Sequence, residues 1–275
     1  MLVNGIESDL VPVADRGFQY GDGLFETLAV ENGVPEFLSR HLERLQKGCE
    51  RLDIDYPGDQ LLSEEAFRIA KGATAAILKI IVTRGCGGRG YRIPERTKST
   101  RVISIHPRRE VRDELSNRGI RAKLCRTRLG INPSLAGLKH LNRLEQILAR
   151  SEWNDPQIQE GLMLDSEGYV IEGTMSNLFL VRSGGLETPQ LDRCGVAGII
   201  RALVLGHAQL NNIPAEIKRL TVGDLESADE IFITNSVIGI WPVVEFNGAA
   251  YDLGRFTLKF MQWLNARRQK RSDHD

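Results

Sequence analysis

The chain has 275 residues, and 36 Lys and Arg balance 36 Asp and Glu, so its formal net charge is zero. Its hydrophobic share of 41% and charged share of 26% are ordinary for a globular protein and exclude a disordered chain. The balanced charge argues against a nucleic-acid partner, and no apolar run reaches the roughly 18 residues of a membrane span. The N-terminus does not resemble a secretory signal.

The cysteines and histidines lack the spacing of a metal site. Cys49, Cys86, Cys125 and Cys194 are far apart and form no Cys-x-x-Cys pair, so we expect no zinc site. We expect free thiols and a cytoplasmic location. No Gly-x-Ser-x-Gly motif is present, which argues against an α/β-hydrolase.

The first part of the chain predicts strands with two helices among them. Asn4-Gly5 between apolar residues indicates a tight hairpin. Leu38, Leu42, Leu45, Cys49 and Leu52 recur at helical spacing and form one apolar stripe. The expected elements are a strand at 25–30, helices at 38–52 and 63–71, and strands at 76–82 and 101–106.

The second part is again rich in strands, starting near Gly119. The sequence Asp165-Ser166-Glu167-Gly168 predicts the turn of a hairpin between 162–164 and 169–171. The other expected elements are a helix at 143–153, a strand at 177–182, a helix at 199–210, a strand at 230–234 and a helix at 256–267.

Strands and helices mix without a regular βαβ alternation, which favours an α+β fold over a doubly wound sheet. The charged run at 108–114 separates the two β-rich parts. We therefore predict a small N-terminal domain at 1–112 and a larger C-terminal domain at 113–275.

A glycine-rich segment at 84–90 contains Arg84 and Arg89. It is neither a Walker A loop nor a dinucleotide-binding fingerprint, because no Gly-Lys-Ser/Thr and no amphipathic helix follows it. It is either a flexible exposed loop or a loop whose arginines bind the carboxylates of an anionic substrate.

Two ionisable residues lie at junctions between expected elements. Lys139, flanked by Leu138 and Leu141, precedes a helix and is either solvated or partly desolvated, which would make its amine a nucleophile or base. Glu172 follows a hairpin strand and is either a turn residue or a buried carboxylate that needs a partner, such as a cationic ring nitrogen.

The helix expected at 199–210 begins after Gly195-Val196-Ala197-Gly198, with no evident Ser, Thr or Asp cap. Its first amides are either capped by water or available to an anion. Arg44 lies off the apolar stripe of its helix, so solvent exposure is its default interpretation.

Taken together, these motifs resemble the fold-type IV pyridoxal-phosphate enzymes, which include branched-chain and D-amino-acid aminotransferases and aminodeoxychorismate lyases. The resemblance covers nearly the whole chain. Its motifs are Asp15–Thr27, His41–Leu45, Thr83–Gly85, Lys139, Glu172–Phe179, Gly198–Arg201, and Ala228–Glu230 with Thr234–Ser236 and Pro242–Val243.

Within this family, Gly90-Tyr91 and the run from Lys139 to Gln146 are most similar to the lyases, and Thr27 stands where branched-chain aminotransferases have glycine. The resemblance implies a two-domain fold and conversion of 4-amino-4-deoxychorismate to 4-aminobenzoate and pyruvate in folate biosynthesis. An aminotransferase of the same fold is one alternative, and a non-catalytic cofactor-binding or scaffold protein is another.

The resemblance also implies residue roles. Lys139 would link covalently to pyridoxal 5'-phosphate and act as the base, and Thr27 would relay a proton. The residues implied for the cofactor are Arg44, Glu172, Asn177, Ile199, Ile200 and Ser236, and those for the substrate are Arg84, Arg89, Tyr91 and Asn235. Family members are homodimers, so we expect a homodimer with a small-molecule substrate and no nucleic-acid or membrane partner.

Overall fold

The computed structural model describes residues 1–95, 97–108 and 111–272. They form two compact units: Met1–Arg108 with Leu138–Asn142, and Arg109–Gly137 with Arg143–His274. The expected boundary at residues 112 and 113 stays a prediction, and Arg109 and Glu110 of its charged run lie outside the described residues. The Leu138–Asn142 segment, which the sequence assigned to the second domain, packs with the first unit.

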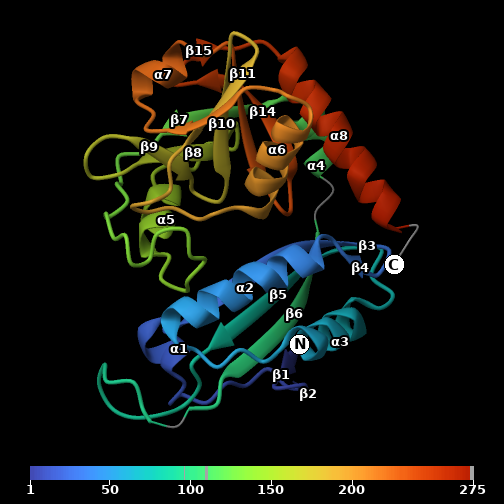
Figure 1. Cartoon of the computed structure of the whole chain (residues 1–275), viewed down its shortest axis with the longest axis vertical. Helices are drawn as coiled ribbons and strands as arrows, with labels where there is room; N and C mark the ends of the chain where they lie inside the picture. The colour runs from blue at the N-terminus through green and yellow to red at the C-terminus, as the bar shows by residue number, and fades with distance from the viewer. Residues whose placement is uncertain (96, 109–110, 273–275) are drawn as a thin grey trace. The chain divides into compact units, whose positions relative to one another are not determined.

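The first unit is a sheet with the strand order β2-β1-β6-β5-β3-β4, accompanied by three helices (Figure 1). Its strands are β1 (Leu2–Val3), β2 (Ile6–Glu7), β3 (Gly23–Glu31), β4 (Val34–Pro35), β5 (Ala75–Thr83) and β6 (Thr100–Pro107), and its helices are α1 (Arg16–Tyr20), α2 (Leu38–Leu52) and α3 (Asp59–Ala70).

Two local sequence signals are confirmed in this unit. Asn4 and Gly5 join β1 to β2 with φ values of 50° and 85°, the two positive φ angles that a type I′ hairpin turn requires. The helix predicted at 38–52 forms over the same residues, and its stripe of Leu38, Leu42, Leu45 and Cys49 is buried, whereas Leu52 at its end is only partly buried. The other predicted helix, at 63–71, begins earlier in the structure, at Asp59.

Helices α2 and α3 pack against this sheet and against each other. Side chains alternate between the two faces of a strand. Leu24, Glu26 and Leu28 of β3 are buried, whereas Phe25 and Thr27 between them are only partly buried. The sheet therefore has a helix-covered face and a second, more accessible face that carries Phe25 and Thr27.

The second unit is built on a nine-stranded sheet with the order β12-β11-β10-β13-β14-β7-β8-β9, in which β15 pairs with β14. The strands are β7 (Ile120–Leu124), β8 (Ile158–Leu164), β9 (Val170–Gly173), β10 (Asn177–Arg182), β11 (Gly185–Pro189), β12 (Ala215–Lys218), β13 (Glu230–Asn235), β14 (Gly239–Phe246) and β15 (Ala249–Ala250). The helices are α4 (Val111–Arg118), α5 (Leu144–Arg150), α6 (Ile199–Leu210), α7 (Val222–Glu226) and α8 (Arg255–Ser272).

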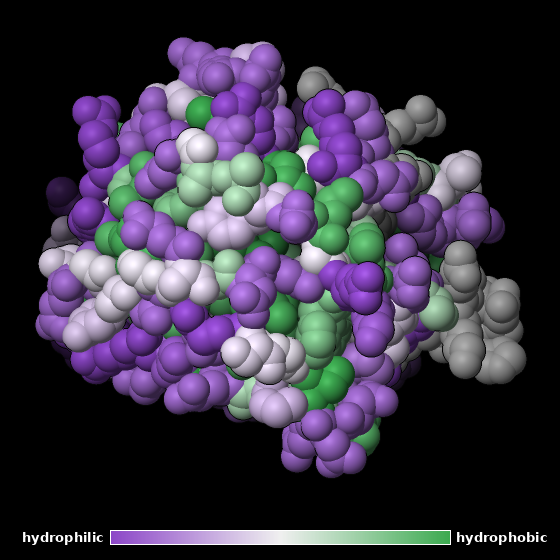
Figure 2. All heavy atoms as spheres, turned by 90° about the horizontal axis from the view of Figure 1, so that it is seen from above, coloured by the Kyte–Doolittle hydropathy of each residue, from purple (hydrophilic) through white to green (hydrophobic). Residues whose placement is uncertain are grey.

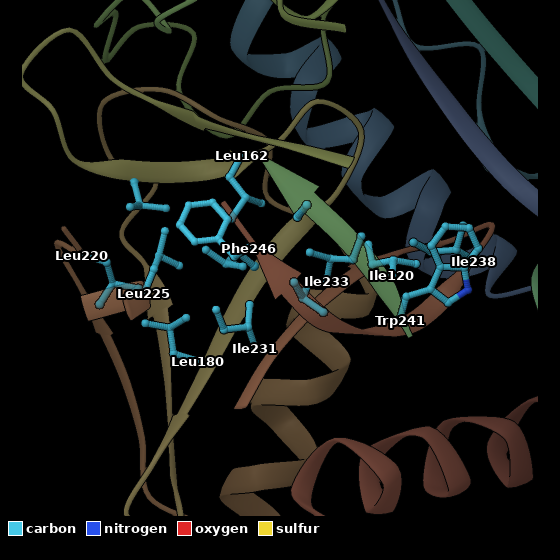
Figure 3. Close-up of a cluster of buried hydrophobic side chains, with 14 of the residues drawn as sticks. Ile120, Leu162, Leu180, Leu220, Leu225, Ile231, Ile233, Ile238, Trp241 and Phe246 are labelled. Carbon is cyan, nitrogen blue, oxygen red and sulfur yellow. The ribbon is translucent and has the colours of Figure 1, made fainter. Parts of the chain in front are cut away.

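Apolar side chains fill both sides of this sheet. Leu162, Leu180, Ile231, Ile233 and Phe246 belong to one buried cluster (Figure 3). The rings of Phe179 and Phe232 stack with centroids 5.0 Å apart, and Phe260 of α8 follows at 6.1 Å from Phe232. Each buried Leu, Ile or Phe side chain stabilises the fold by about 1.5–3 kcal/mol.

The helix at 199–210 and the strand at 177–182 form over the predicted residues. The helix predicted at 143–153 is shorter, and the sequence analysis missed α1, α4 and α7. Hydrophilic residues dominate the face shown in Figure 2, with hydrophobic residues in smaller areas between them. Within the described part of the chain, no helix has both the length and the apolar character needed to cross a membrane.

Candidate active site

Lys139 belongs to a short segment that pairs with the beginning of β3. The Phe25 N–H donates to the Lys139 carbonyl at 2.9 Å, and the Leu141 N–H donates to the Gly23 carbonyl at 3.0 Å. These two bonds flank the antiparallel pair Leu24 and His140. The segment therefore extends the sheet of the first unit, and its backbone is fixed by ladder hydrogen bonds.

This register places Lys139 directly opposite Phe25, on the same face of the sheet. The Lys139 Nζ lies 4.3 Å from the centroid of the Phe25 ring. Thr27, two residues further along β3, shares that face and stands diagonally to Lys139, a relation that places Cβ atoms about 7–8 Å apart. A lysine side chain can span that distance, so the two residues predicted to be catalytic face the same space.

A second lysine, which the sequence analysis missed, occupies this face. Lys79 of β5 pairs with Thr27, and its Nζ lies 5.1 Å from the Phe25 ring centroid. The signal in the sequence was a lone lysine inside the apolar strand Ala76–Val82, at a position that alternation places beside Thr27. Lys79 and Lys139 together make this face cationic.

The opposite side of β3 holds a buried ionic cluster. Glu26 accepts a hydrogen bond from the Arg44 Nε at 2.8 Å and contacts the His41 Nδ1 at 2.6 Å. Burial raises the pKa of Glu26, but the charge of Arg44 and the hydrogen bonds from His41 and Arg44 outweigh it and lower that pKa to about 2. Burial also lowers the pKa of His41, although Glu26 opposes the shift, so the imidazole is neutral at neutral pH.

Arg44 is therefore ion-paired rather than solvated, in contrast to the default interpretation of its sequence position. It lines a cavity of about 10 Å³ together with Phe25, Glu26 and Lys139. That volume holds about one water molecule. The predicted phosphate ligand and the predicted cofactor lysine thus border the same cavity.

The residues predicted to bind substrate separate into two groups. Arg89 and Tyr91 are exposed on the glycine-rich loop. Arg84 is only 4% exposed, and it donates to the Asp22 carboxylate and to the carbonyls of Leu52 and Asp53. Because those contacts occupy its guanidinium, we assign Arg84 a structural role and do not retain it as a substrate ligand.

In the second unit, Glu172 and Asn177 both bond to the backbone of Val196. The Val196 N–H donates to Glu172 Oε2 at 2.8 Å, and the Val196 carbonyl accepts from Asn177 Nδ2 at 2.8 Å. Both side chains are about 95% buried. Glu172 is thus a buried carboxylate with a defined orientation, and Asn177 fixes the segment that leads into α6.

The N-terminus of α6 has the features of an anion site. Gly198 precedes Ile199 and Ile200 without a side-chain cap, and a Cβ there would lie 1.9 Å from Asn177 Oδ1, so only glycine fits. Arg201, in the first turn, donates to the uncharged Thr188 hydroxyl and Pro189 carbonyl. Burial lowers its pKa to about 10. A cation at the positive end of a helix dipole is costly unless an anion lies nearby.

Asn235 and Ser236 form the turn between β13 and β14. The Asn235 Oδ1 accepts from the amides of Val237 and Ile238 at 2.9 and 2.8 Å, and its Nδ2 donates to the Met175 carbonyl at 3.1 Å. The Asn235 side chain therefore shapes this turn, which is a different task from the predicted contact with substrate. Ser236 accepts a hydrogen bond from Arg268 through its backbone carbonyl.

Known proteins resemble this chain over most of its length. The amino-transferase class IV family model matches residues 23–246. An aminodeoxychorismate lyase of Vibrio harveyi is 36% identical over 96% of this chain and 98% of the relative. A putative branched-chain-amino-acid aminotransferase of Methanocaldococcus jannaschii is 32% identical over 92% of this chain and 89% of its own length.

Solved structures share the fold. The crystal structure of 4-amino-4-deoxychorismate lyase from Pseudomonas aeruginosa superposes with a TM-score of 0.92 and 45% sequence identity, covering 96% of this chain and 98% of the other. This match confirms the predicted α+β fold class.

Proposed function

Because this chain belongs to the amino-transferase class IV family, we propose that it is a pyridoxal-phosphate-dependent lyase that converts 4-amino-4-deoxychorismate to 4-aminobenzoate and pyruvate. Relatives with this activity cover almost the whole chain, and their identities of 36% and 45% exceed the 32% of the aminotransferase relative. The chain also has Thr27 and Gly90-Tyr91, the lyase-like residues of the sequence.

The described residues fit pyridoxal phosphate. Lys139 offers the amine for covalent attachment, and the buried Glu172 offers a fixed negative charge for a protonated ring nitrogen. The amides of Ile199 and Ile200, with Ser236, suit a phosphate dianion, and Arg44 adds a guanidinium. When bound, the cofactor supplies an electron sink for the pair released at the carbon bearing the amine.

The residues of the accessible face of β3 then move the protons. The amine of Lys139 removes the proton from the carbon that bears the substrate amine. Thr27, on the same face, donates a proton at the departing enolpyruvyl oxygen, or Lys139 returns it. Formation of the aromatic ring drives the elimination.

Cationic and polar side chains of this face and of the glycine-rich loop are proposed to select the substrate. Lys79 lies beside Thr27 and Phe25, and Arg89 and Tyr91 extend from the loop. The substrate carries carboxylates, which ammonium and guanidinium groups bind through charge-assisted hydrogen bonds. We therefore assign Lys79, Arg89 and Tyr91 to substrate binding.

The observation that carries this proposal is the pairing of residues 139–141 with residues 23–25, which puts Lys139 and Thr27 on one face. The test supplies holoenzyme with 4-amino-4-deoxychorismate and no keto acid. We expect 4-aminobenzoate and pyruvate in equal amounts, because the elimination needs no amino-group acceptor. Keto acids formed from D- or branched-chain amino acids, without any 4-aminobenzoate, would instead establish the aminotransferase alternative.

We further propose a cytoplasmic homodimer. In α5 the apolar side chains of Leu144, Ile147 and Leu148 are between 58% and 73% exposed, an arrangement that supports association with a second copy. All four cysteines are free thiols, which supports a reducing compartment. Sedimentation analysis of the holoenzyme tests the dimer, and a monomer at micromolar concentration would refute it.

A further inference from the structure

The base of the glycine-rich loop is anchored by one carboxylate. Asp22 accepts hydrogen bonds from Arg84 at 2.7 and 3.1 Å and from the Arg16 Nε at 2.9 Å. Burial raises the pKa of Asp22, but the bonds and charges of Arg84 and Arg16 outweigh it, so that pKa lies below its ordinary value. The loop therefore begins at a fixed ionic junction rather than as a free segment.

The tip of the loop is held by helix α1. The Gly90 N–H donates to the Tyr20 hydroxyl at 3.3 Å, and the Gly90 carbonyl accepts from the Arg16 Nη1 at 3.0 Å. The Arg16 guanidinium lies 4.9 Å from the centroid of the Tyr20 ring, and Tyr20 meets Tyr91 edge to face at 5.6 Å. The backbone of Gly90 is thus held both at its N–H and at its carbonyl.

The arginine that holds the loop is buried, whereas the loop residue next to Gly90 is exposed to solvent. Arg16 is 3% exposed, whereas Tyr91 is 86% exposed. Gly90 lies between Arg89 and Tyr91 and has a φ of 77°, a left-handed conformation that glycine adopts without strain. Ordering a loop residue costs conformational entropy, and without these hydrogen bonds to Gly90 that cost would reduce the affinity for substrate.

We propose that Arg16 and Tyr20 are positioning residues that clamp the peptide groups on either side of Gly90 and thereby preorganise Arg89 and Tyr91 for the substrate carboxylates. The inference rests on the proposed function, which assigns those two loop residues to the substrate. The clamp lies within one chain, so it acts in the same way whichever subunit's site the loop completes.

The test compares Tyr20→Phe and Arg16→Met with the wild-type holoenzyme. Losing one hydrogen bond to the loop is expected to raise KM about 3–10-fold in either variant, while kcat and the affinity for pyridoxal phosphate stay within about twofold. Cleavage by chymotrypsin after Tyr91 and by trypsin after Arg89 or Arg92 becomes faster, because the released loop samples more conformations.

Matched controls come from the second unit. Tyr251 donates from its hydroxyl to the Leu225 carbonyl at 3.1 Å, and Arg182 bonds to backbone carbonyls and carboxylates as Arg16 does. Tyr251→Phe and Arg182→Met therefore remove similar contacts away from the loop. Neither control should change KM or cleavage within the loop.

The outcomes separate this inference from the proposed function. If Arg89→Ala leaves KM unchanged, the assignment of the loop to the substrate fails. If Arg89→Ala raises KM but Tyr20→Phe does not, the clamp is refuted while the proposed function stands. A higher KM without faster cleavage also refutes the clamp, since the effect would not pass through loop order. Should Arg16→Met not fold, Tyr20→Phe alone decides.

Discussion

The two units treat charge differently. In the first unit, Glu26 is ion-paired with Arg44, and Asp22 is ion-paired with Arg16 and Arg84, so both carboxylates have partners of opposite sign. In the described part of the second unit, Arg201 donates to uncharged oxygens, and no side chain there caps the N-terminus of α6. The first unit compensates its charges internally, whereas the start of α6 in the second unit carries positive charge that we propose is balanced by an anion.

The largest expected effect concerns Lys139, which lies in the first unit. Lys139→Ala removes the amine proposed to hold the cofactor and to act as the base. We expect turnover and the visible absorption band of the bound cofactor to disappear, a loss of at least about 10⁴-fold in kcat. A variant that retains both its band and its activity would overturn the assignment.

Glu172→Gln tests whether the second unit must contribute charge as well as shape. Glutamine keeps an acceptor for the Val196 N–H but lacks the negative charge that we propose pairs with the ring nitrogen. We expect kcat to fall about 100-fold or more, with the fold intact by circular dichroism. Wild-type turnover in this variant would show that the buried carboxylate serves only to hold the backbone of Val196.

Glu26→Gln tests the internal compensation of the first unit. Removing one member of a buried ion pair costs about 3–5 kcal/mol in the free energy of unfolding. Glu65, which accepts two hydrogen bonds from Arg101 at 2.9 and 2.7 Å, offers a matched control, and Glu65→Gln should lower stability without altering cofactor affinity. Urea denaturation at neutral pH measures the free energy of unfolding of both variants.

The stabilisation that Glu26 provides should also depend on pH. The folded-state pKa of Glu26, about 2, lies below its ordinary value of 4.5, so the stabilisation is fully present above pH 4.5 and declines as the pH falls toward 2. The difference in unfolding free energy between wild type and Glu26→Gln should therefore shrink over that interval. A constant difference down to pH 2 would contradict the assigned pKa.

The smallest expected effect concerns Thr27. Because Lys139 can also return the proton, we expect Thr27→Val to lower kcat about tenfold, which corresponds to ~1.4 kcal/mol in the activation barrier. Thr27→Ser keeps the hydroxyl and should retain most of the rate. Equal kcat values for the Val and Ser variants would show that the Thr27 hydroxyl takes no part in proton transfer.

Sequence patterns were informative where a residue's environment is local. The stripe of α2 and the Asn4-Gly5 turn depend on neighbours a few positions away, so both formed over the predicted residues. Helix α1 has five residues and too few side chains for a periodic signal. Helix α4 was missed because its charged residues resemble those of a linker.

Residues whose roles depend on distant partners were harder to interpret. Arg84 was expected to meet substrate, but Asp22 and the end of α2 enclose it. Lys79 was overlooked because only the pairing of β5 with β3 places it beside Thr27. The motif order identified Lys139 and Glu172 as candidates, whereas the contacts of Val196 with Glu172 and Asn177 could be found only in three dimensions.

The pairing of residues 139–141 with the start of β3 also bears on folding kinetics. The strands β3, β5 and β6 come from the first part of the chain and can assemble early, but the reactive lysine joins them only after a long loop closes. During refolding, recovery of the far-ultraviolet signal should therefore precede recovery of cofactor binding. A chain with its sheet already formed would still lack its reactive amine.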